Sequence, residues 1–308
     1  MKAAAKIFCA FAFLAMPVAA EAQGIPSRIP EGELKEHVEY LCDSICAGRG
    51  FATRGSFETQ FFLQRSLKEM SFRPVLQSFT ADLDSVRYGC NVVLELNAAR
   101  QYRNNAGTIV VMAHYDGTGT HSGRLFPGAD SNASGVAALL TILRHINLYG
   151  SRNNLVFAFL DGHNASMAGA RTLLESLQAK GHKIKMAVSL DILGASLSPV
   201  QEGREDYLIA LGGEKWKKDL QELNSGLGLQ LSYDYYGSPS FTELFYRRIG
   251  DQSVFLEAGI PSVMFTSGIT MNTNKVSDGP DSLCWPVFRK RVELVMRWLE
   301  VLLYKING

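Results

Sequence analysis

The sequence predicts an α/β fold with a mostly parallel, mixed central sheet and helices on both faces. Three continuous apolar runs, Thr108–Ala113, Leu155–Leu160 and Met186–Leu190, have the length and composition of strands that are covered on both sides. Helical patterns lie between them, near 132–148 and 166–180. Strands that alternate with helices in this way belong to βαβ units, in which neighbouring strands run parallel.

The chain before these strands predicts two helices. The first covers residues 31–47, because Pro30 stands at its start, Glu31 lies in its first turn and Gly48 ends it. The second runs from about Ser56 to Met70, with apolar residues recurring on one side. The remaining predicted elements are strands at 91–96, 207–211 and 262–265 and a long final helix that begins near Val287.

The first 22 residues predict an exported protein. Lys2 and Lys6 form a basic start, residues 7–20 are mostly apolar, and small residues lead to Ala22 at the spacing that a signal peptidase accepts. The apolar run is shorter than the ~20 residues that span a membrane, although an uncleaved anchor and a buried helix are alternatives. Cleavage near Ala22 leaves residues 23–308 as a single secreted or periplasmic domain, a length that α/β folds often reach.

The net charge bears on the classes of partner, and the cysteine content bears on disulfides. Cleavage removes two lysines and one glutamate, which takes the net charge from +1 to 0. A neutral domain without a basic stripe argues against nucleic acid and anionic membranes. The mature chain keeps four cysteines, which allow three disulfide pairings in an oxidising compartment or serve as small buried hydrophobes. They are Cys42, Cys46, Cys90 and Cys284.

Polar residues follow each of the three apolar runs. His114 ends the first, and Asp116 lies two residues on, where it can orient the ring as carboxylates do for metal-binding histidines. Asp130 stands just before a helix, where its ordinary role is to cap the helix. The residues after the second and third runs include Asp161, His163, Asn164 and Asp191. Because chemistry in such sheets gathers beyond the carboxyl ends of the strands, these residues are candidates for one site.

The order and spacing of these segments resemble the co-catalytic zinc exopeptidases, which include leucyl aminopeptidases, glutamate carboxypeptidases and glutaminyl cyclases. The resemblance covers nearly all of the mature chain and implies the two-zinc aminopeptidase fold, with metal-assisted hydrolysis in active members. It is carried by His37-Val-Glu-Tyr-Leu, Ala47-Gly-Arg-Gly, Ala113-His-Tyr-Asp, Gly128-Ala-Asp-Ser-Asn-Ala-Ser-Gly-Val, Phe255-Leu-Glu-Ala-Gly-Ile-Pro-Ser-Val and Ser277-Asp-Gly-Pro-Asp.

Only part of the family's machinery is implied for this chain. The resemblance implies three ligands for one zinc, with the second of them shared between both metals: His114, Asp130 and Asp191. His163 and Asn164 replace two adjacent glutamates, of which the first is the general base and the second binds the other zinc. Asn274 replaces a late histidine ligand. Since amide oxygens are poor zinc ligands, we expect at most one tightly bound zinc.

Two functions compete. The favoured one is a non-catalytic or strongly impaired relative that binds a peptide, another small ligand or a partner protein, because a fold does not secure its function once site residues change. The alternative is an active aminopeptidase with one zinc. In the active enzyme His163 would shuttle protons. Two other roles are open: His163 closes the zinc site as a fourth ligand, or it fills the polar pocket that the replaced glutamate has left. The fold implies that His114, Asp130, His163 and Asp191 converge in one crevice, which Asn164 and Asn274 face.

Overall fold

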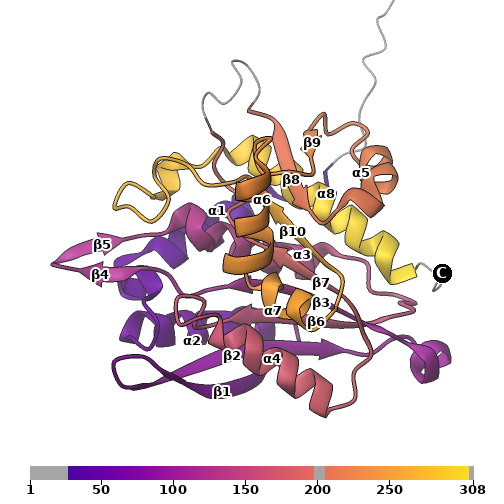
Figure 1. Ribbon diagram of the computed structural model, residues 1–308, viewed down its shortest axis with the longest axis horizontal. Helices are drawn as coiled ribbons and strands as arrows, with labels where there is room; N and C mark the ends of the chain where they lie inside the picture. Colours follow the sequence, from indigo (N-terminus) through magenta and orange to yellow (C-terminus); the bar gives the residue numbers. More distant parts are fainter. Residues whose placement is uncertain (1–26, 198–204, 305–308) are drawn as a thin grey trace, which may run out of the picture.

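An eight-stranded mixed sheet runs through the molecule in the order β1-β2-β6-β3-β7-β10-β8-β9 (Figure 1). The computed structural model describes residues 27–197 and 205–304, so the predicted signal segment lies outside the described residues. The central strands β6, β3, β7 and β10 run parallel, and antiparallel pairs flank them. The strands of the sheet are β1 (Val75–Asp82), β2 (Val86–Leu96), β3 (Thr108–His114), β6 (Asn154–Leu160), β7 (Ile184–Leu190), β8 (Tyr207–Leu211), β9 (Gln230–Ser232) and β10 (Ser262–Thr266).

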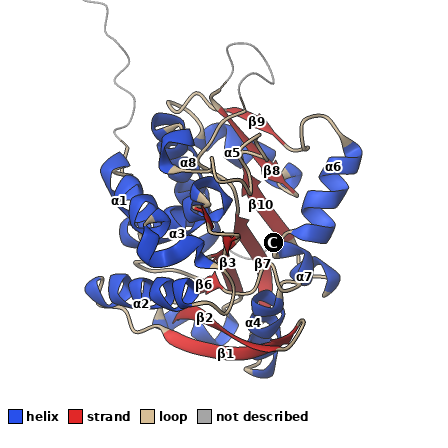
Figure 2. Ribbon diagram, turned by 90° about the vertical axis from the view of Figure 1, so that its left-hand side faces the viewer, coloured by secondary structure: helices blue, strands red, loops and turns tan. Residues whose placement is uncertain are grey.

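Helices cover both faces of this sheet, as predicted (Figure 2). One face packs against α1, α2, α3 and α8, and the other packs against α4 and α7. The helices are α1 (Glu31–Cys42), α2 (Arg54–Glu69), α3 (Gly135–His145), α4 (Ala168–Ala179), α5 (Lys217–Leu223), α6 (Pro239–Leu244), α7 (Gln252–Glu257) and α8 (Trp285–Tyr304). A separate hairpin joins β4 (Gly119–His121) to β5 (Arg124–Phe126).

The central strand β3 shows why its sequence is apolar throughout. All seven of its residues are buried. Ile109 and Val111 point into the core beneath α1, α2, α3 and α8, whereas Val110 and Met112 point into the core beneath α4 and α7. Because side chains alternate between the faces of a strand, a strand with two covered faces needs apolar residues at every position. Burying one such side chain contributes about 1.5–3 kcal/mol.

The predicted first helix is shorter than its pattern indicated. It ends at Cys42, because the Asp43 carboxylate accepts a hydrogen bond from the Ile45 amide at 2.8 Å and begins a 3-10 turn over Ser44–Arg49. In that turn Ala47 has a φ of 45°, outside the helical range. The prediction also missed β1, whose outer position in the sheet leaves most of its side chains exposed, so its residues show no apolar run.

The first described residues are fastened to the last helix. The buried Glu293 on α8 accepts hydrogen bonds from the Ser27 hydroxyl and from the amides of Arg28 and Ile29, at 2.9, 2.9 and 3.2 Å. The Arg28 guanidinium also binds both carboxylate oxygens of Glu300 at 2.8 Å. The two ends of the described chain therefore lie side by side.

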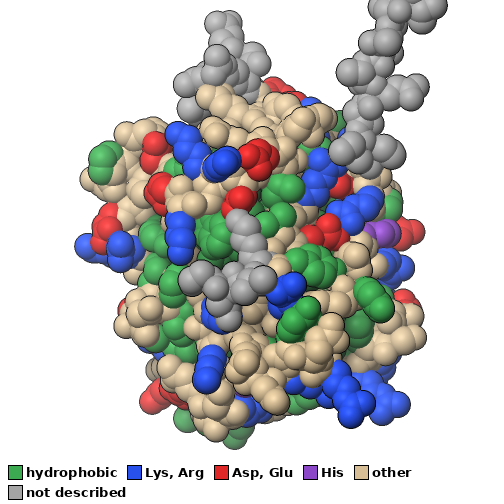
Figure 3. All heavy atoms as spheres, turned by 90° about the vertical axis from the view of Figure 1, so that its right-hand side faces the viewer, with side chains coloured by type: hydrophobic (Ala, Val, Ile, Leu, Met, Phe, Trp, Pro, Cys, Tyr) green, Lys and Arg blue, Asp and Glu red, His purple; other side chains and the backbone are tan. Residues whose placement is uncertain are grey.

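The surface and the cysteines add little that is specialised. On the face shown in Figure 3, side chains of both charges are intermixed across its described part, unlike the single-sign stripe of a polyanion-binding surface. Among the described residues, no helix is both long and apolar enough to cross a membrane. The four described cysteines carry free thiols.

Candidate functional site

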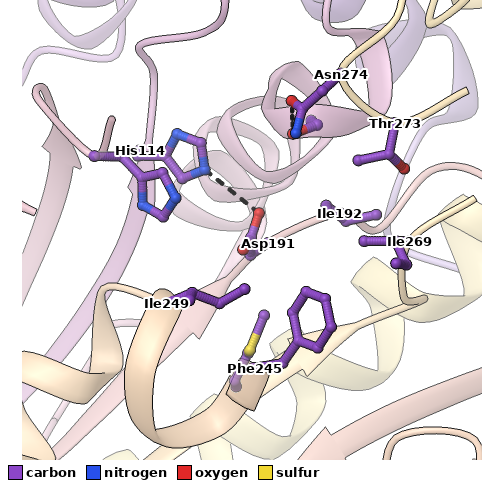
Figure 4. A pocket seen from close by; sticks show the side chains of 12 residues that line it. His114, Asp191, Ile192, Phe245, Ile249, Ile269, Thr273 and Asn274 are labelled. Carbon is purple, nitrogen blue, oxygen red and sulfur yellow. Dashed lines mark hydrogen bonds and ion pairs between the residues drawn. The ribbon is translucent and has the colours of Figure 1, made fainter. Parts of the chain in front are cut away.

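A pocket opens beyond the carboxyl ends of β3 and β7, where the parallel-sheet rule places a site. Its cavity volume is about 90 Å³. One side is polar, and the other is formed by apolar side chains from η5 (Phe245–Ile249), β10 and the following loop (Figure 4). The lining residues are His114, Ser131, His163, Asp191, Ile192, Phe245, Ile249, Gly250, Met264, Ile269, Thr273 and Asn274. The predicted convergence therefore holds for His114, His163 and Asp191, and Asn274 joins them.

His114 is the last residue of β3 and is buried at the pocket floor. Its Nδ1 lies 3.0 Å from the carbonyl oxygen of Asp116, and because a carbonyl only accepts, Nδ1 is the donor. The other nitrogen, Nε2, lies 3.4 Å from Oδ1 of Asp191. Burial lowers the pKa of His114, but the Asp116 and Asp191 carboxylates outweigh it and hold the pKa well above the usual value. The same ion pair lowers the pKa of Asp191 against the effect of its burial.

His163 stacks on His114, and its partner is a residue that the sequence did not single out. The two rings lie 3.9 Å apart with an angle of 10° between their planes. His163 Nδ1 lies 3.0 Å from Oδ2 of the buried Asp251. Burial and the neighbouring His114 lower the pKa of His163, but Asp251 raises it above its usual value. Asp251 directly precedes α7, so in the sequence it resembles an ordinary helix cap.

Asp116 holds the loop that carries His163. Its carboxylate accepts hydrogen bonds from the His163 amide at 3.0 Å and from the Asn164 amide at 3.1 Å. The sequence predicted that the Asp116 carboxylate orients the His114 ring. The backbone carbonyl of Asp116 accepts the hydrogen bond from Nδ1, whereas the carboxylate oxygen lies 3.7 Å from Nδ1. Asn164 is exposed, and its side-chain amide points back to Asp116 at 3.4 Å. Asn164 is absent from the pocket lining, contrary to the expectation that it faces the crevice.

Asp130 does not line the pocket, and the expectation that it joins the other residues there is not met. Its Oδ1 accepts hydrogen bonds from the amides of Gly194 and Ala195 at 2.7 and 3.1 Å and lies 3.3 Å from the Ser134 hydroxyl. The next residue, Ser131, reaches the pocket instead. The peptide bond that follows Ser131 is cis.

Ser131 and Asn274 meet on the polar side of the pocket. The Ser131 hydroxyl lies 3.5 Å from Oδ1 of Asn274 (Figure 4). Both are neutral, so neither balances the charge of a metal ion. A two-metal centre needs several carboxylate ligands, and Asp191 is the one carboxylate among the residues that line this pocket. The residues present therefore do not fit a two-zinc centre.

The structure does contain a group of side chains that could bind a single metal ion. Within the described ranges, His114, His163 and Asp251 offer ligand atoms that all lie within 4.8 Å of one another. Asp251 Oδ1 is buried and has no hydrogen-bond partner in the described part of the chain, and Asp191 Oδ1 has its ion pair with His114 but no hydrogen bond. Unpartnered buried carboxylate oxygens beside imidazoles are the donor set that a divalent transition metal takes. The site thus fits one ion.

The pKa of Asp130 predicts how stability changes with pH. Burial, reinforced by the nearby Asp278 charge, raises this pKa from 3.8 to about 7. Between these values the folded state binds more protons than the unfolded state, so stability falls as pH rises from about 4 to about 7. Asp130→Asn removes this loss, and we expect it to stabilise the protein by up to about 4 kcal/mol at pH 8 and to change little at pH 4.

Urea unfolding at both pH values measures this difference. The matched control is Asp84→Asn at an exposed position, which we expect to change stability by less than ~0.5 kcal/mol at either pH. A variant at position 130 that is less stable than the wild type at pH 8 contradicts the assignment of a buried, unfavourable charge.

Comparison with known sequences agrees with this geometry. A family model described as peptidase family M28 matches residues 91–298, about two thirds of the chain. A protein described as a probable leucine aminopeptidase of Arthroderma otae is 28% identical over 100 residues. That stretch is 30% of this chain and 27% of the relative, so it spans about a quarter of the relative's length.

Solved structures share the fold at low identity. The LapA aminopeptidase of Legionella pneumophila has a TM-score of 0.69 at 15% identity, covering 91% of this chain and 73% of that one. BSAP, a zinc aminopeptidase from Bacillus subtilis, has a TM-score of 0.70 at 12% identity, covering 91% and 97%. A glutaminyl cyclase of Bacteroides thetaiotaomicron, bound to N-acetylhistamine, has a TM-score of 0.67 at 15% identity, covering 92% and 100%. With this fold and a family match over most of its length, the chain belongs to peptidase family M28.

Proposed function

We propose that this chain is an exported, single-domain member of family M28 that binds a peptide or another small ligand and has lost most or all aminopeptidase activity. One observation carries the proposal: Ser131 occupies the pocket while the Asp130 carboxylate is held away from it by Gly194 and Ala195. Without a carboxylate shared between them, two metal ions in one pocket repel each other, and no negative charge lies between them to offset the repulsion. The basic and apolar start of the sequence supports export after cleavage near Ala22.

The proposed ligand follows from the two sides of the pocket. Its apolar side suits one hydrocarbon side chain, and its polar side offers imidazole and carboxylate groups. A cavity of about 90 Å³ accepts a group no larger than one side chain. A peptide end with an apolar first residue matches both the size and the chemistry. We propose that the protein neither binds nucleic acid nor spans a membrane.

One observation favours the alternative, an aminopeptidase that works with one metal. His163 and Asp251 form a base and a carboxylate in hydrogen-bond contact, as in catalytic dyads. The carboxylate raises the pKa of His163, so the imidazole is a stronger base but is protonated over a wider pH range. His163 is also an imidazole where the family pattern has a glutamate base, and it differs from a carboxylate in reach and in charge. We therefore favour impaired catalysis.

Zinc content and hydrolysis measured together test the proposed function. The purified protein is dialysed against zinc, its metal is counted by mass spectrometry, and leucyl arylamide is supplied as substrate beside BSAP as the positive control. We expect at most one zinc per chain and hydrolysis at least 10²–10⁴-fold slower than the control, because general base catalysis alone contributes about this factor. Two zinc ions with hydrolysis close to that of the control would show that the alternative is right.

A further inference from the structure

We propose that a single divalent transition-metal ion binds between His114, His163 and Asp251, so that Asp251 supplies the carboxylate that Asp130 does not. This rests on the proposed function, because it assigns the ligands of the one metal that function allows. The three residues come from the end of β3, the loop after β6 and the start of α7, three segments that the fold brings to one floor. Neither His163 nor Asp251 is a ligand by the sequence resemblance.

The distances suit an ion after a small contraction. The three ligand atoms lie within 4.8 Å of one another. In a tetrahedral zinc shell with bonds of ~2.0–2.1 Å, neighbouring ligand atoms lie about 3.3 Å apart. The side chains therefore have to close by about 1–1.5 Å at most. His114 presents Nε2 for this purpose, because its Nδ1 is already committed to the Asp116 carbonyl.

An unpartnered carboxylate oxygen of Asp251 offers a further ligand atom to a cation. Asp251 is 2% exposed, and its Oδ1 finds no partner among the described residues. Asp191 Oδ1 differs, because it forms an ion pair with His114 Nε2 at 3.4 Å. A buried carboxylate oxygen without a donor is costly, and a cation beside Asp251 relieves that cost. Asp191 can then approach as a fourth ligand or through a water molecule.

The stack of the two rings must open when the ion binds. A metal lies in the plane of an imidazole ring, and two rings 3.9 Å apart with only 10° between their planes cannot both point at one ion. His163 therefore has to turn. Its hydrogen bond to Asp251 is then replaced by the binding of both residues to the same ion. His163 is partly exposed, at 20% of its side chain, which leaves it room to turn.

Asp130 is the poorer carboxylate for this ion, although neither it nor Asp251 lines the pocket itself. Its Oδ1 already has two backbone amide donors, at 2.7 and 3.1 Å. Its Oδ2 is buried without a hydrogen-bond partner in the described part of the chain, but Asp130 does not belong to the group of close metal-binding side chains that includes Asp251. Asp130 and Asp251 are both buried aspartates, so the same isosteric change at each makes a matched pair.

Metal titration of the full chain tests the assignment. The metal-free protein is titrated with Zn²⁺ by calorimetry and with Co²⁺ by visible absorption, whose intensity reports tetrahedral coordination. We expect one site in the wild type and at least ~100-fold weaker binding in Asp251→Asn, since even residues behind the ligands change affinity by 10–100-fold. Asp130→Asn should bind within about threefold of the wild type. His163→Gln removes a second ligand without touching α7 and should weaken binding in the same way if Asp251→Asn folds poorly.

The outcomes separate this assignment from the proposed function. If Asp130→Asn abolishes binding while Asp251→Asn keeps it, or if the wild type binds no metal, the assignment is wrong and the proposed function stands. If the wild type binds two ions and cleaves leucyl arylamide efficiently, the proposed function fails. Loss of the tetrahedral Co²⁺ band in both Asp251→Asn and His163→Gln, with the band kept in Asp130→Asn, supports the assignment.

Discussion

Four substitutions together should rebuild a two-zinc centre in this chain, whereas three should not. We expect Ser131→Asp, His163→Glu, Asn164→Glu and Asn274→His in one protein to bind two zinc ions. A carboxylate at position 164 is repelled by Asp116, which the Asn164 side chain contacts at 3.4 Å, and so has to turn from it toward the pocket. The same protein with Ser131 kept should bind at most one. The reason is that Ser131 lines the pocket beside Asn274, so an aspartate there reaches the space between two metals. Asp130 stays bound to the amides of Gly194 and Ala195.

The fourfold variant should also recover hydrolysis. Restoring a general base contributes about 10²–10⁴-fold, and a second metal stabilises the developing oxyanion. Residues that act as a unit give little when restored singly, so the threefold variant should gain less than tenfold. Zinc per chain and the rate on leucyl arylamide are measured on both. If the threefold variant already holds two zinc ions, Asp130 can turn into the pocket and the placement of Ser131 loses its significance.

Removing the buried Arg49 should strongly destabilise the region that supports the site. Its guanidinium is fully buried and donates to the carbonyl oxygens of Leu41, Tyr115, Pro127 and Gly128, at 2.6 to 3.0 Å. Arg49→Met keeps the volume but leaves these carbonyls without that donor. Each unsatisfied buried group costs about 1–3 kcal/mol, so we expect a loss of about 4 kcal/mol or more, a large share of a typical 5–15 kcal/mol stability.

Urea unfolding followed by circular dichroism measures that loss. The matched control is Arg73→Met, at an exposed position, which should change stability by less than ~0.5 kcal/mol. Arg49→Lys should fall between the two, because an ammonium reaches fewer of the carbonyls than the fork of a guanidinium. A loss below 1 kcal/mol for Arg49→Met means that water replaces the guanidinium and that these loops do not depend on it.

The central sheet could be predicted because its signal is redundant. Each residue of β3, β6 and β7 repeats the same requirement for an apolar side chain, so a run such as Leu155–Leu160 leaves little choice. The edge strand β1 gave no such signal, because one exposed side accepts many residue types. Short helices such as α6 were missed for the same reason: they have too few turns to show a period.

The site could be located but not resolved to single residues. Spacing placed His114, His163 and Asp191 in one pocket, because each follows a buried strand. It selected Asp130, whereas Ser131 lines the pocket, because the turn that brings one of these neighbours to the pocket is set by contacts from elsewhere. The side chain of Asn132 donates to the carbonyl of Leu190 at 3.0 Å and accepts from the amide of Ile192 at 3.0 Å.

Asp251 was missed because its partner is distant in the sequence. It lies 88 positions from His163, and a lone acid before a short helix has many ordinary explanations. No pattern within one sequence connects the two. The contact exists only once η5 and α7 are placed over the end of the sheet, which depends on the packing of Val254 and Phe255 beneath them.

The anchor of the first described residues on Glu293 sets an order on how the molecule assembles. Arg28 and Glu293 are 265 positions apart, and closing a chain segment of that length carries an entropy loss of about 5 kcal/mol if nothing else has formed. The contact therefore forms after the sheet has shortened the path between them. We therefore expect the segment around Ile29 to dock after the sheet and α8 have packed together. A protease that cuts near residue 27 would accordingly distinguish finished molecules from nearly finished ones.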